Sequence, residues 1–394
     1  MNEFQKKVLG NNVTVLFEKR NIPVVSLSIT TNNGAEFETE KEKGISHFIE
    51  HFVFKGTKTR TGDEIAREIE KRGGVINAYT SEEVTSFLAK LPPKHVDVGF
   101  DILSDVFFNP SFLKEEFEKE KKVIMEELRM YKDNPIYHVH EVIKDILYKK
   151  PFGMFVGGNL NSVGNMTRQM LVDSYHRNYR NKTTVCVVGN ADFDQICDFA
   201  SKFPKCNGKL KEVKIEKSNK EEVEKRKGLD QAHFVFGYHS PFAGDDKRHL
   251  YNLVLTYLGG GMSSVLNTEI REKRGLAYAV KSDILAEKNF GYSTIYVGTV
   301  KENLATVKKL ILKGFKDLSK MKQKDFDEVK EQMIGLREIS EEDSMHVMNS
   351  LVLEDLGKGA EEYYKFDDKI NALKFSDVKN FKLPKHSTFA LVPA

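Results

Sequence analysis

The sequence has 394 residues, and its 61 basic and 58 acidic residues leave a formal net charge of only +3. With 40% hydrophobic and 30% charged residues, the chain is expected to form two or three domains with sizeable cores, which excludes a small stapled module and a disordered chain. The near balance of charge gives no argument for nucleic acid or an anionic membrane as a partner.

Cysteine usage and apolar runs bear on the location of the protein. Cys186, Cys197 and Cys206 show no C-x-x-C spacing, which argues against a disulfide framework and a cysteine zinc site. A reducing compartment, the cytoplasm, is therefore expected. No stretch approaches the roughly 18 apolar residues of a membrane span, and no apolar signal-peptide core follows the N-terminus. We expect no membrane span, and export would require a leader that has been removed.

The first half of the chain alternates strand-like runs with helical periodicities. In chain order it begins with a predicted strand at 24–29 and a predicted helix at 44–54, and a further strand follows at 84–88. Five apolar residues of the helix fall on one stripe, namely Ile45, Phe48, Ile49, Phe52 and Val53. We expect this stripe to pack on a core.

The opposite side of this helix carries His47, Glu50 and His51. Two histidines four residues apart on one helix face can bind a single metal ion, and the intervening glutamate points beside that ion. The spacing is H-x-x-E-H, that of the inverted zincins. The alternative is a pair of ordinary surface histidines. A catalytic zinc site would also need one more protein ligand and a position for water.

A long predicted helix at 114–133 offers that ligand. Its buried stripe is expected to consist of Phe117, Ile124, Leu128 and Tyr131. Helical phase places Glu127 on the flank of this stripe, where it can reach inward, whereas Glu126 should face water. Glu120 lies two turns earlier on the same edge, which suits a role in orienting a ligand. For any single glutamate of this Lys/Glu-rich helix, the alternative is a solvated charge.

Composition changes at residues 205–227, which are rich in Lys and Glu and poor in large apolar residues. We interpret this range as a charged linker, with a charged helix face as the alternative. It separates a first domain, 1–204, from a second, 228–394. The second domain begins with a predicted strand at 232–238 and continues with helices and with strands within 277–299.

The two halves share a local pattern. Residues 68–73 end at a glycine and are followed by Ala78-Tyr79, and residues 269–275 end at a glycine and are followed by Ala277-Tyr278. Each predicts a helix that stops at glycine and turns into a strand. A duplicated α+β domain is one explanation, and coincidence is the other.

These motifs together resemble the pitrilysin family of inverzincin metallopeptidases, specifically its two-domain subfamily that includes the mitochondrial and bacterial processing peptidases. The resemblance spans most of the chain. It rests on the segments 47–51, 54–57, 77–81, 120–128, 133–135, 151–153, 166–168, 188–190, 259–264 and 271–278. Departures are mild: Lys121 stands where an arginine is common, and nothing after Lys358 aligns with a family motif.

The resemblance implies a role for each matching residue. It implies that His47, His51 and Glu127 bind one zinc ion per chain, that Glu50 is the general base, and that Glu120 supports the ligands. It implies that Arg271 and Tyr278 bind substrate near the zinc from a different domain, and that Asn77 and Ala78 hold the peptide backbone. Taken without the resemblance, an arginine near a helix end and a tyrosine opening a strand more often have structural roles.

The resemblance also implies a fold and an assembly. The fold is α+β, with two similar domains, each a mainly antiparallel sheet covered by helices. Two chains enclose a chamber, as a homodimer or as a heterodimer with a related chain. The expected activity is zinc-dependent cleavage of short or unfolded peptides, or of presequences. Two alternatives stay open: a noncatalytic, peptide-holding subunit of this fold, and a zinc-stabilised binding module, which would need a fourth protein ligand.

Overall fold

The computed structural model describes residues 3–179, 181–206 and 213–394, and they form two compact units. Unit 1 consists of the ranges 1–130, 154–214 and 341–352, and unit 2 of the ranges 131–153, 215–340 and 353–394. Two of the boundaries, 130/131 and 352/353, fall inside helices, namely α4 (Lys114–Asp133) and α12 (Ser344–Gly357). Each unit has its own sheet and is described by itself below.

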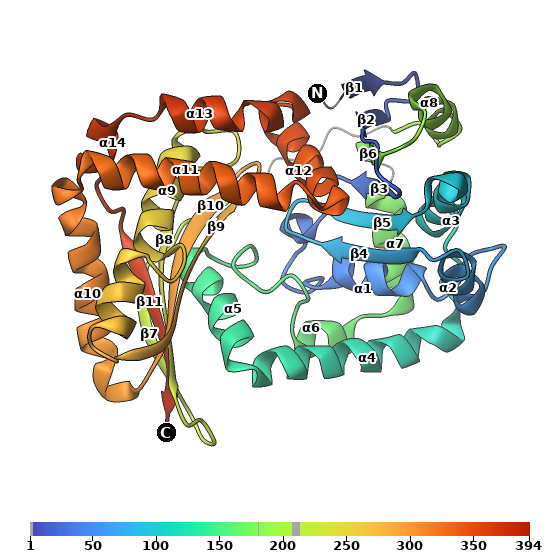
Figure 1. The fold of residues 1–394 in the computed structure, drawn as a ribbon. Helices are drawn as coiled ribbons and strands as arrows, with labels where there is room; N and C mark the ends of the chain where they lie inside the picture. Colours follow the sequence, from blue (N-terminus) through green and yellow to red (C-terminus); the bar gives the residue numbers. More distant parts are fainter. Residues whose placement is uncertain (1–2, 180, 207–212) are drawn as a thin grey trace. The chain divides into compact units, whose positions relative to one another are not determined.

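Unit 1 contains a six-stranded sheet in the order β1-β2-β6-β3-β5-β4. Its strands are β1 (Glu3–Val8), β2 (Thr14–Lys19), β3 (Val25–Thr31), β4 (Val75–Thr80), β5 (Thr85–Leu91) and β6 (Thr183–Gly189). Strands β2 and β6 are parallel, and every other pair is antiparallel. Strand β4 lies at one edge of this sheet (Figure 1).

Helices cover the sheet of unit 1 because every second residue of a strand points to the same face, and on this face those residues are apolar. The helices are α1 (Ile45–Val53), α2 (Gly62–Glu70), α3 (Val96–Phe108), α4, α6 (Leu160–Asn165), α7 (Arg168–Asn178) and α8 (Phe193–Ser201), with 3-10 turns at Ala35–Phe37 and Pro93–His95. Their apolar residues join Val25, Leu27 and Ile29 of β3 in one core. The other side of β3 meets the start of α12, where the Ser26 and Ser344 hydroxyl oxygens lie 2.8 Å apart.

Unit 2 contains a five-stranded sheet in the order β7-β11-β8-β10-β9. Its strands are β7 (Glu221–Arg226), β8 (Ala232–His239), β9 (Ala277–Ala286), β10 (Gly291–Thr299) and β11 (His386–Pro393). Strands β7 and β11 are parallel, and the others pair antiparallel.

Both faces of the second sheet are buried, each in its own apolar cluster. Helix α5 (Pro135–Leu147) covers one face, where Val139, Ile143 and Leu147 pack on strands β8, β10 and β11. The other face packs on the remaining elements (Figure 1): α9 (Lys247–Gly259), a π-helical segment (Asn267–Glu272), α10 (Leu304–Asp317), α11 (Gln323–Ser340), α13 (Phe366–Ala372) and α14 (Phe375–Lys379). Short 3-10 turns lie at Lys301–Asn303, Leu318–Lys320 and Ala360–Lys365.

The two sheets share one topology, which confirms the predicted α+β fold of two similar domains. Numbered by their order along each unit, five strands lie in the order first, fifth, second, fourth, third in both sheets, and β1 is an addition to the first. The repeated sequence pattern maps onto the third strand of each set, β4 and β9. A glycine with positive φ precedes each strand, Gly73 at 73° and Gly275 at 59°, as expected where a helix ends.

The two units differ in three places from the predicted ranges. Residues 131–153 pack in unit 2 because α5 buries its apolar side against that sheet, and residues 341–352 pack in unit 1. The predicted linker at 205–227 contains strand β7, which pairs with β11. The one apolar residue of β7, Val223, is 66% exposed. This edge strand therefore lacks the apolar run that is typical of a buried strand. The stretch 207–212 of that predicted linker lies outside the described residues.

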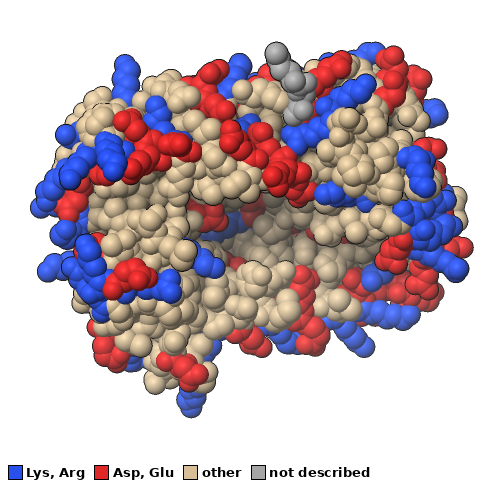
Figure 2. Space-filling model, viewed as in Figure 1, with Lys and Arg blue, Asp and Glu red and all other residues tan. Residues whose placement is uncertain are grey.

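The surface carries charges of both signs, as the near balance of basic and acidic residues leads one to expect. In Figure 2, basic and acidic side chains are interspersed on the visible face. All three cysteines are buried and none forms a disulfide bond. Within the described ranges, no helix has both the length and the apolar character needed to cross a membrane.

Candidate metal centre

Helix α1 places its polar residues as helical phase predicts. The five residues of its apolar stripe are all buried, which turns His47, Glu50 and His51 away from the core. The N-cap residue of the helix is Gly44, whose φ of 98° lies in the left-handed region that favours glycine. Glycine has no side chain that could cap the first backbone N–H groups of α1. Instead Glu38 accepts hydrogen bonds from the backbone N–H groups of Gly44 and Ser46, at 2.9 and 2.7 Å.

Helix α4 presents Glu127 and Glu126 differently. Phe117, Ile124 and Leu128 are buried, so the flank of that stripe faces α1. The side chain of Glu127 is only 20% exposed, whereas that of Glu126 is 72% exposed and pairs with Arg129 on the same helix. Of these two glutamates, Glu127 is therefore the one available to a metal ion beside α1.

His47, His51 and Glu127 converge. One donor atom from each lies within 4.8 Å of the others. Oε2 of Glu127 lies 3.4 Å from Nε2 of His51 and 3.9 Å from Nε2 of His47. Tetrahedral zinc with N and O ligands at about 2.0–2.2 Å separates its ligand atoms by roughly 3.3–3.6 Å, so these spacings fit one zinc ion after small adjustments.

A buried, unsatisfied oxygen supports this fit. Within the described part of the chain, Oε2 of Glu127 is buried and makes no hydrogen bond. Such an atom normally has a partner, because leaving a carboxylate oxygen buried without one costs about 1–3 kcal/mol or more. Two imidazole nitrogens and one carboxylate oxygen are also the donor types that zinc takes in catalytic sites.

The electrostatics favour neutral His47, as metal binding requires. Burial, followed by the charge of His51, lowers the pKa of His47 to about 3. For His51, burial opposes the charged form, but the hydrogen bond to Glu120 and the carboxylates of Glu50 and Glu127 outweigh it and raise the pKa. Burial raises the pKa of Glu50 as well, against the hydrogen bond from Thr80.

Glu120 and Lys55 lie behind His51. Nδ1 of His51 lies 3.0 Å from Oε1 of Glu120, which leaves Nε2 facing Glu127. The other Glu120 oxygen, Oε2, lies 2.7 Å from the Lys55 ammonium group. These contacts outweigh burial and lower the pKa of Glu120. Lys55 was not predicted as a site residue, although it lies only four residues after His51 in the sequence.

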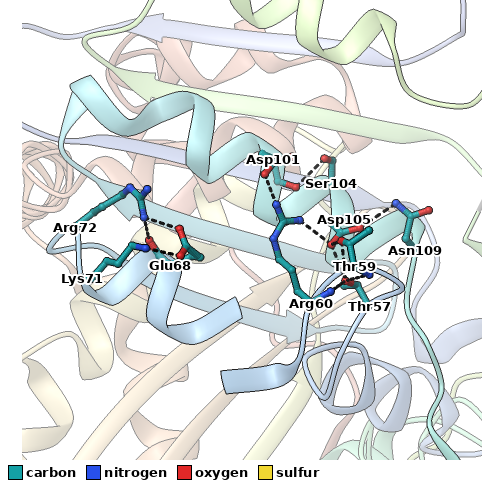
Figure 3. A network of polar contacts seen from close by, with 10 residues as sticks. All are labelled: Thr57, Thr59, Arg60, Glu68, Lys71, Arg72, Asp101, Ser104, Asp105 and Asn109. Atoms are coloured by element: carbon teal, nitrogen blue, oxygen red, sulfur yellow. Dashed lines mark hydrogen bonds and ion pairs between the residues drawn. The ribbon is translucent and has the colours of Figure 1, made fainter. Parts of the chain in front are cut away.

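The loop that carries Lys55 is attached to helix α3 through Asp105 (Figure 3). Oδ2 of Asp105 accepts hydrogen bonds from Thr57 at 2.6 Å, Thr59 at 2.7 Å and Arg60 at 2.8 Å. Its Oδ1 accepts from Asn109 at 3.1 Å. These donors outweigh burial and lower the pKa of Asp105. A pocket of about 610 Å³ opens beside the loop, lined by residues 55, 57–64, 113 and 116.

Edge strand β4 approaches Glu50. The Thr80 hydroxyl donates a hydrogen bond of 2.6 Å to Oε2 of Glu50, a contact that sequence analysis missed. Asn77 and Ala78 lie on the same strand, and Oδ1 of Asn77 accepts from the N–H of Ala78 at 2.9 Å. One side of β4 pairs with β5, and its other side is the edge of the sheet.

Arg271 and Tyr278 belong to unit 2, whereas the residues above belong to unit 1. Arg271 lies in the π-helical segment, within the helix predicted to stop at Gly275, and its side chain is 44% exposed. Tyr278 lies on edge strand β9 and is 44% exposed.

Two family models match this chain. Residues 13–155 match the model described as insulinase (peptidase family M16), and residues 165–333 match the one described as peptidase M16 inactive domain. A Bacillus subtilis protein described as the uncharacterized zinc protease YmxG is 33% identical over 336 residues, which cover 83% of this chain and 80% of that protein. A Rickettsia felis protein described as an uncharacterized zinc protease is 33% identical over 333 residues, covering 82% and 79%.

Solved structures show the same fold at lower identity. The crystal structure of a Helicobacter pylori protease matches with a TM-score of 0.91 at 21% identity and covers 100% of both chains. A Pseudomonas fluorescens structure described as a peptidase M16 inactive domain matches with a TM-score of 0.88 at 18% identity, covering 99% of this chain and 98% of that one. At these identities the likeness concerns the fold alone.

Proposed function

Because this chain belongs to the insulinase (M16) family of peptidases, we propose that it is a zinc-dependent endopeptidase that hydrolyses short or unfolded peptides. The observation that carries the proposal is the convergence of His47, His51 and Glu127, with Glu50 beside them on α1. Relatives described as zinc proteases support the same metal and reaction class.

In this proposal His47, His51 and Glu127 hold the zinc ion. When bound, zinc lowers the pKa of a water molecule and polarises the peptide carbonyl. Glu50 takes the proton of the attacking water and returns it to the leaving amine. A carboxyl group whose pKa is raised by burial suits both steps, and the hydroxyl of Thr80 fixes the orientation of Glu50.

Substrate binding is assigned to edge strand β4 and to two residues of unit 2, Arg271 and Tyr278. We propose that the extended peptide pairs with the free edge of β4 at Asn77 and Ala78, because an unpaired strand edge offers backbone groups to a substrate. Arg271 and Tyr278 supply hydrogen-bond donors for the peptide or for the oxyanion that develops during hydrolysis. Glu120, held by Lys55, orients His51 through its Nδ1.

We further propose that two identical chains assemble so that Arg271 and Tyr278 of one serve the zinc site of the other. A related partner chain is the alternative assembly. Three buried cysteines without a disulfide support a reducing location, the cytoplasm. The proposed domains are 1–204 and 228–394, apart from the exchanged segments described above.

The main rival is a noncatalytic, peptide-holding subunit of the same fold. A subunit of that kind has no need for Glu50 beside a convergent ligand set. A zinc-stabilised binding module would need a closed site of four protein ligands, and the group found among the described residues has three.

The test combines metal analysis with cleavage of a quenched fluorescent peptide. We expect about one zinc ion per purified chain and loss of cleavage in 1,10-phenanthroline. Glu50→Gln should keep the metal but lower kcat by at least about a hundredfold, because it removes the proton acceptor and no ligand. Undiminished cleavage by metal-free protein would refute the proposal, and a metal-loaded wild type that cleaves nothing would favour the noncatalytic subunit.

A further inference from the structure

Tyr278 is surrounded on the sheet of unit 2 by residues that sequence analysis did not single out. We propose that Tyr296, His233 and Gly298 are positioning residues: they hold Tyr278 in one orientation and leave its hydroxyl hydrogen free to donate to the substrate. This inference rests on the proposed function, since it takes Tyr278 as a group that binds peptide.

The backbone at Tyr278 is irregular. In the pairing of β9 with β10, Gly298 lies opposite Ala279, but Thr299 lies opposite Ala277. Tyr278 is therefore the extra residue of a β-bulge. A bulge locally bends its strand and redirects a side chain. The Thr299 hydroxyl also donates to the carbonyl of Leu276, which anchors the chain just before the bulge.

Gly298 provides the surface on which the tyrosine ring lies. A Cβ atom built at position 298 would be 2.1 Å from Cζ and 2.4 Å from the hydroxyl oxygen of Tyr278. Real Cβ atoms do not approach other heavy atoms so closely. The ring therefore lies directly over the glycine, and any larger residue would displace it. Strand β8 pairs with the other edge of β10, and there Gly298 is opposite His233. The glycine therefore lies between the side chains of Tyr278 and His233.

Hydrogen bonds join the same residues. The hydroxyl oxygens of Tyr278 and Tyr296 lie 3.1 Å apart, and that of Tyr296 lies 2.8 Å from Nδ1 of His233. Tyr296 is 1% exposed and His233 is 7% exposed. The Tyr296 ring also packs against His140 of α5, with ring centroids 5.8 Å apart. Tyr278, which is itself 44% exposed, thus has its hydroxyl hydrogen-bonded to a buried side chain.

The direction of these hydrogen bonds decides what Tyr278 can donate. Burial, followed by the charge of Arg226, lowers the pKa of His233, so its imidazole is neutral near pH 7. In this proposal the proton of the neutral imidazole is on Nδ1, so that His233 donates to Tyr296 and Tyr296 donates to Tyr278. The hydroxyl hydrogen of Tyr278 is then available to a substrate carbonyl. The opposite direction would consume that hydrogen inside the sheet.

The experiment compares Tyr296→Phe and Gly298→Ala with Tyr292→Phe. Tyr292 is a matched control, since it lies on the same strand and the same side as Tyr296 but not in this hydrogen-bonded group. In protein labelled with 13C at tyrosine Cζ, the Tyr278 resonance is identified by its loss in Tyr278→Phe. We expect Tyr296→Phe and Gly298→Ala to shift that resonance and Tyr292→Phe to leave it in place.

Kinetics add a readout that a general loss of stability would not reproduce. Tyr296→Phe should lower kcat/KM by about threefold to tenfold, and it should have no further effect in a Tyr278→Phe background. An unmoved Tyr278 resonance, or losses that simply add, would overturn the inference. A wild type without metal-dependent cleavage would instead refute the proposed function, and the resonance would still decide whether Tyr296 and Gly298 position Tyr278.

Discussion

At the scale of single residues, two adjacent glutamates of α4 give the sharpest test of the metal site. Glu127→Gln should lower zinc affinity by more than about a hundredfold, because it weakens one of three protein ligands. Glu126→Gln changes the same chemistry one residue away on a side chain that is 72% exposed, and it should leave zinc affinity unchanged. Zinc affinity is measured by competition with a chromophoric chelator. Equal affinities for the two variants would contradict the proposed ligand set.

Helical phase explains why this part of the site was predictable. The positions of His47, His51 and Glu127 follow from two amphipathic helices, because residues three and four apart share a helix face. Lys55 and Thr80 were not predictable in this way. Their partners, Glu120 and Glu50, lie 65 and 30 residues away in the sequence, and a contact of that kind depends on tertiary packing rather than on local periodicity.

At the scale of structural elements, Asp105 connects the loop after α1 to α3. Asp105→Asn should lower the free energy of unfolding of unit 1 by about 1–3 kcal/mol at pH 7, because it removes the charge that pairs with Arg60 and weakens the hydrogen bonds from Thr57 and Thr59. Asp101→Asn is the matched control. Asp101 contacts the same arginine, but its side chain is 60% exposed, so we expect a loss below about 1 kcal/mol. Urea unfolding of both variants measures the difference.

The lowered pKa of Asp105 predicts that the stability lost in Asp105→Asn depends on pH. The pKa of Asp105 is lowered in the folded state, so its contribution is fully present above the unfolded pKa and is lost as the pH falls through the folded pKa. The difference in stability between wild type and Asp105→Asn should therefore shrink on acidification. A difference that stays constant from neutral pH to below about pH 3 would show that the carboxylate charge is not involved.

Element prediction from the sequence was limited where burial was low. Strand β8 was predicted from its buried apolar run, whereas β7 was not, because it is an edge strand made almost entirely of charged residues. The exchange of 131–153 into unit 2 was missed for another reason. The apolar face of α5 predicts a helix that packs on something, but it does not specify which of the two sheets it covers.

At the scale of the whole molecule, the two sheets share one strand order but carry different residues at the same edge. Strands β4 and β9 occupy equivalent edges of their sheets, yet β4 carries Thr80 beside Glu50 and β9 carries Tyr278. The two units therefore have different roles in the proposed site. Unit 1 holds the metal and the proton acceptor, and unit 2 supplies hydrogen-bond donors to the substrate. A single chain therefore contains every part of the proposed site.

Mixing two inactive variants tests whether these parts act between chains. Glu50→Gln and Arg271→Ala should each be nearly inactive alone. If the site is shared, a mixed dimer has one complete site, with Glu50 from one chain and Arg271 from the other. Random co-folding of equal amounts makes about half of the dimers mixed, each with one complete site of two, so about a quarter of the wild-type activity should return. Pairs that act within one chain would recover none, and absence of activity in dimers shown to be mixed by mass spectrometry would reject the shared site.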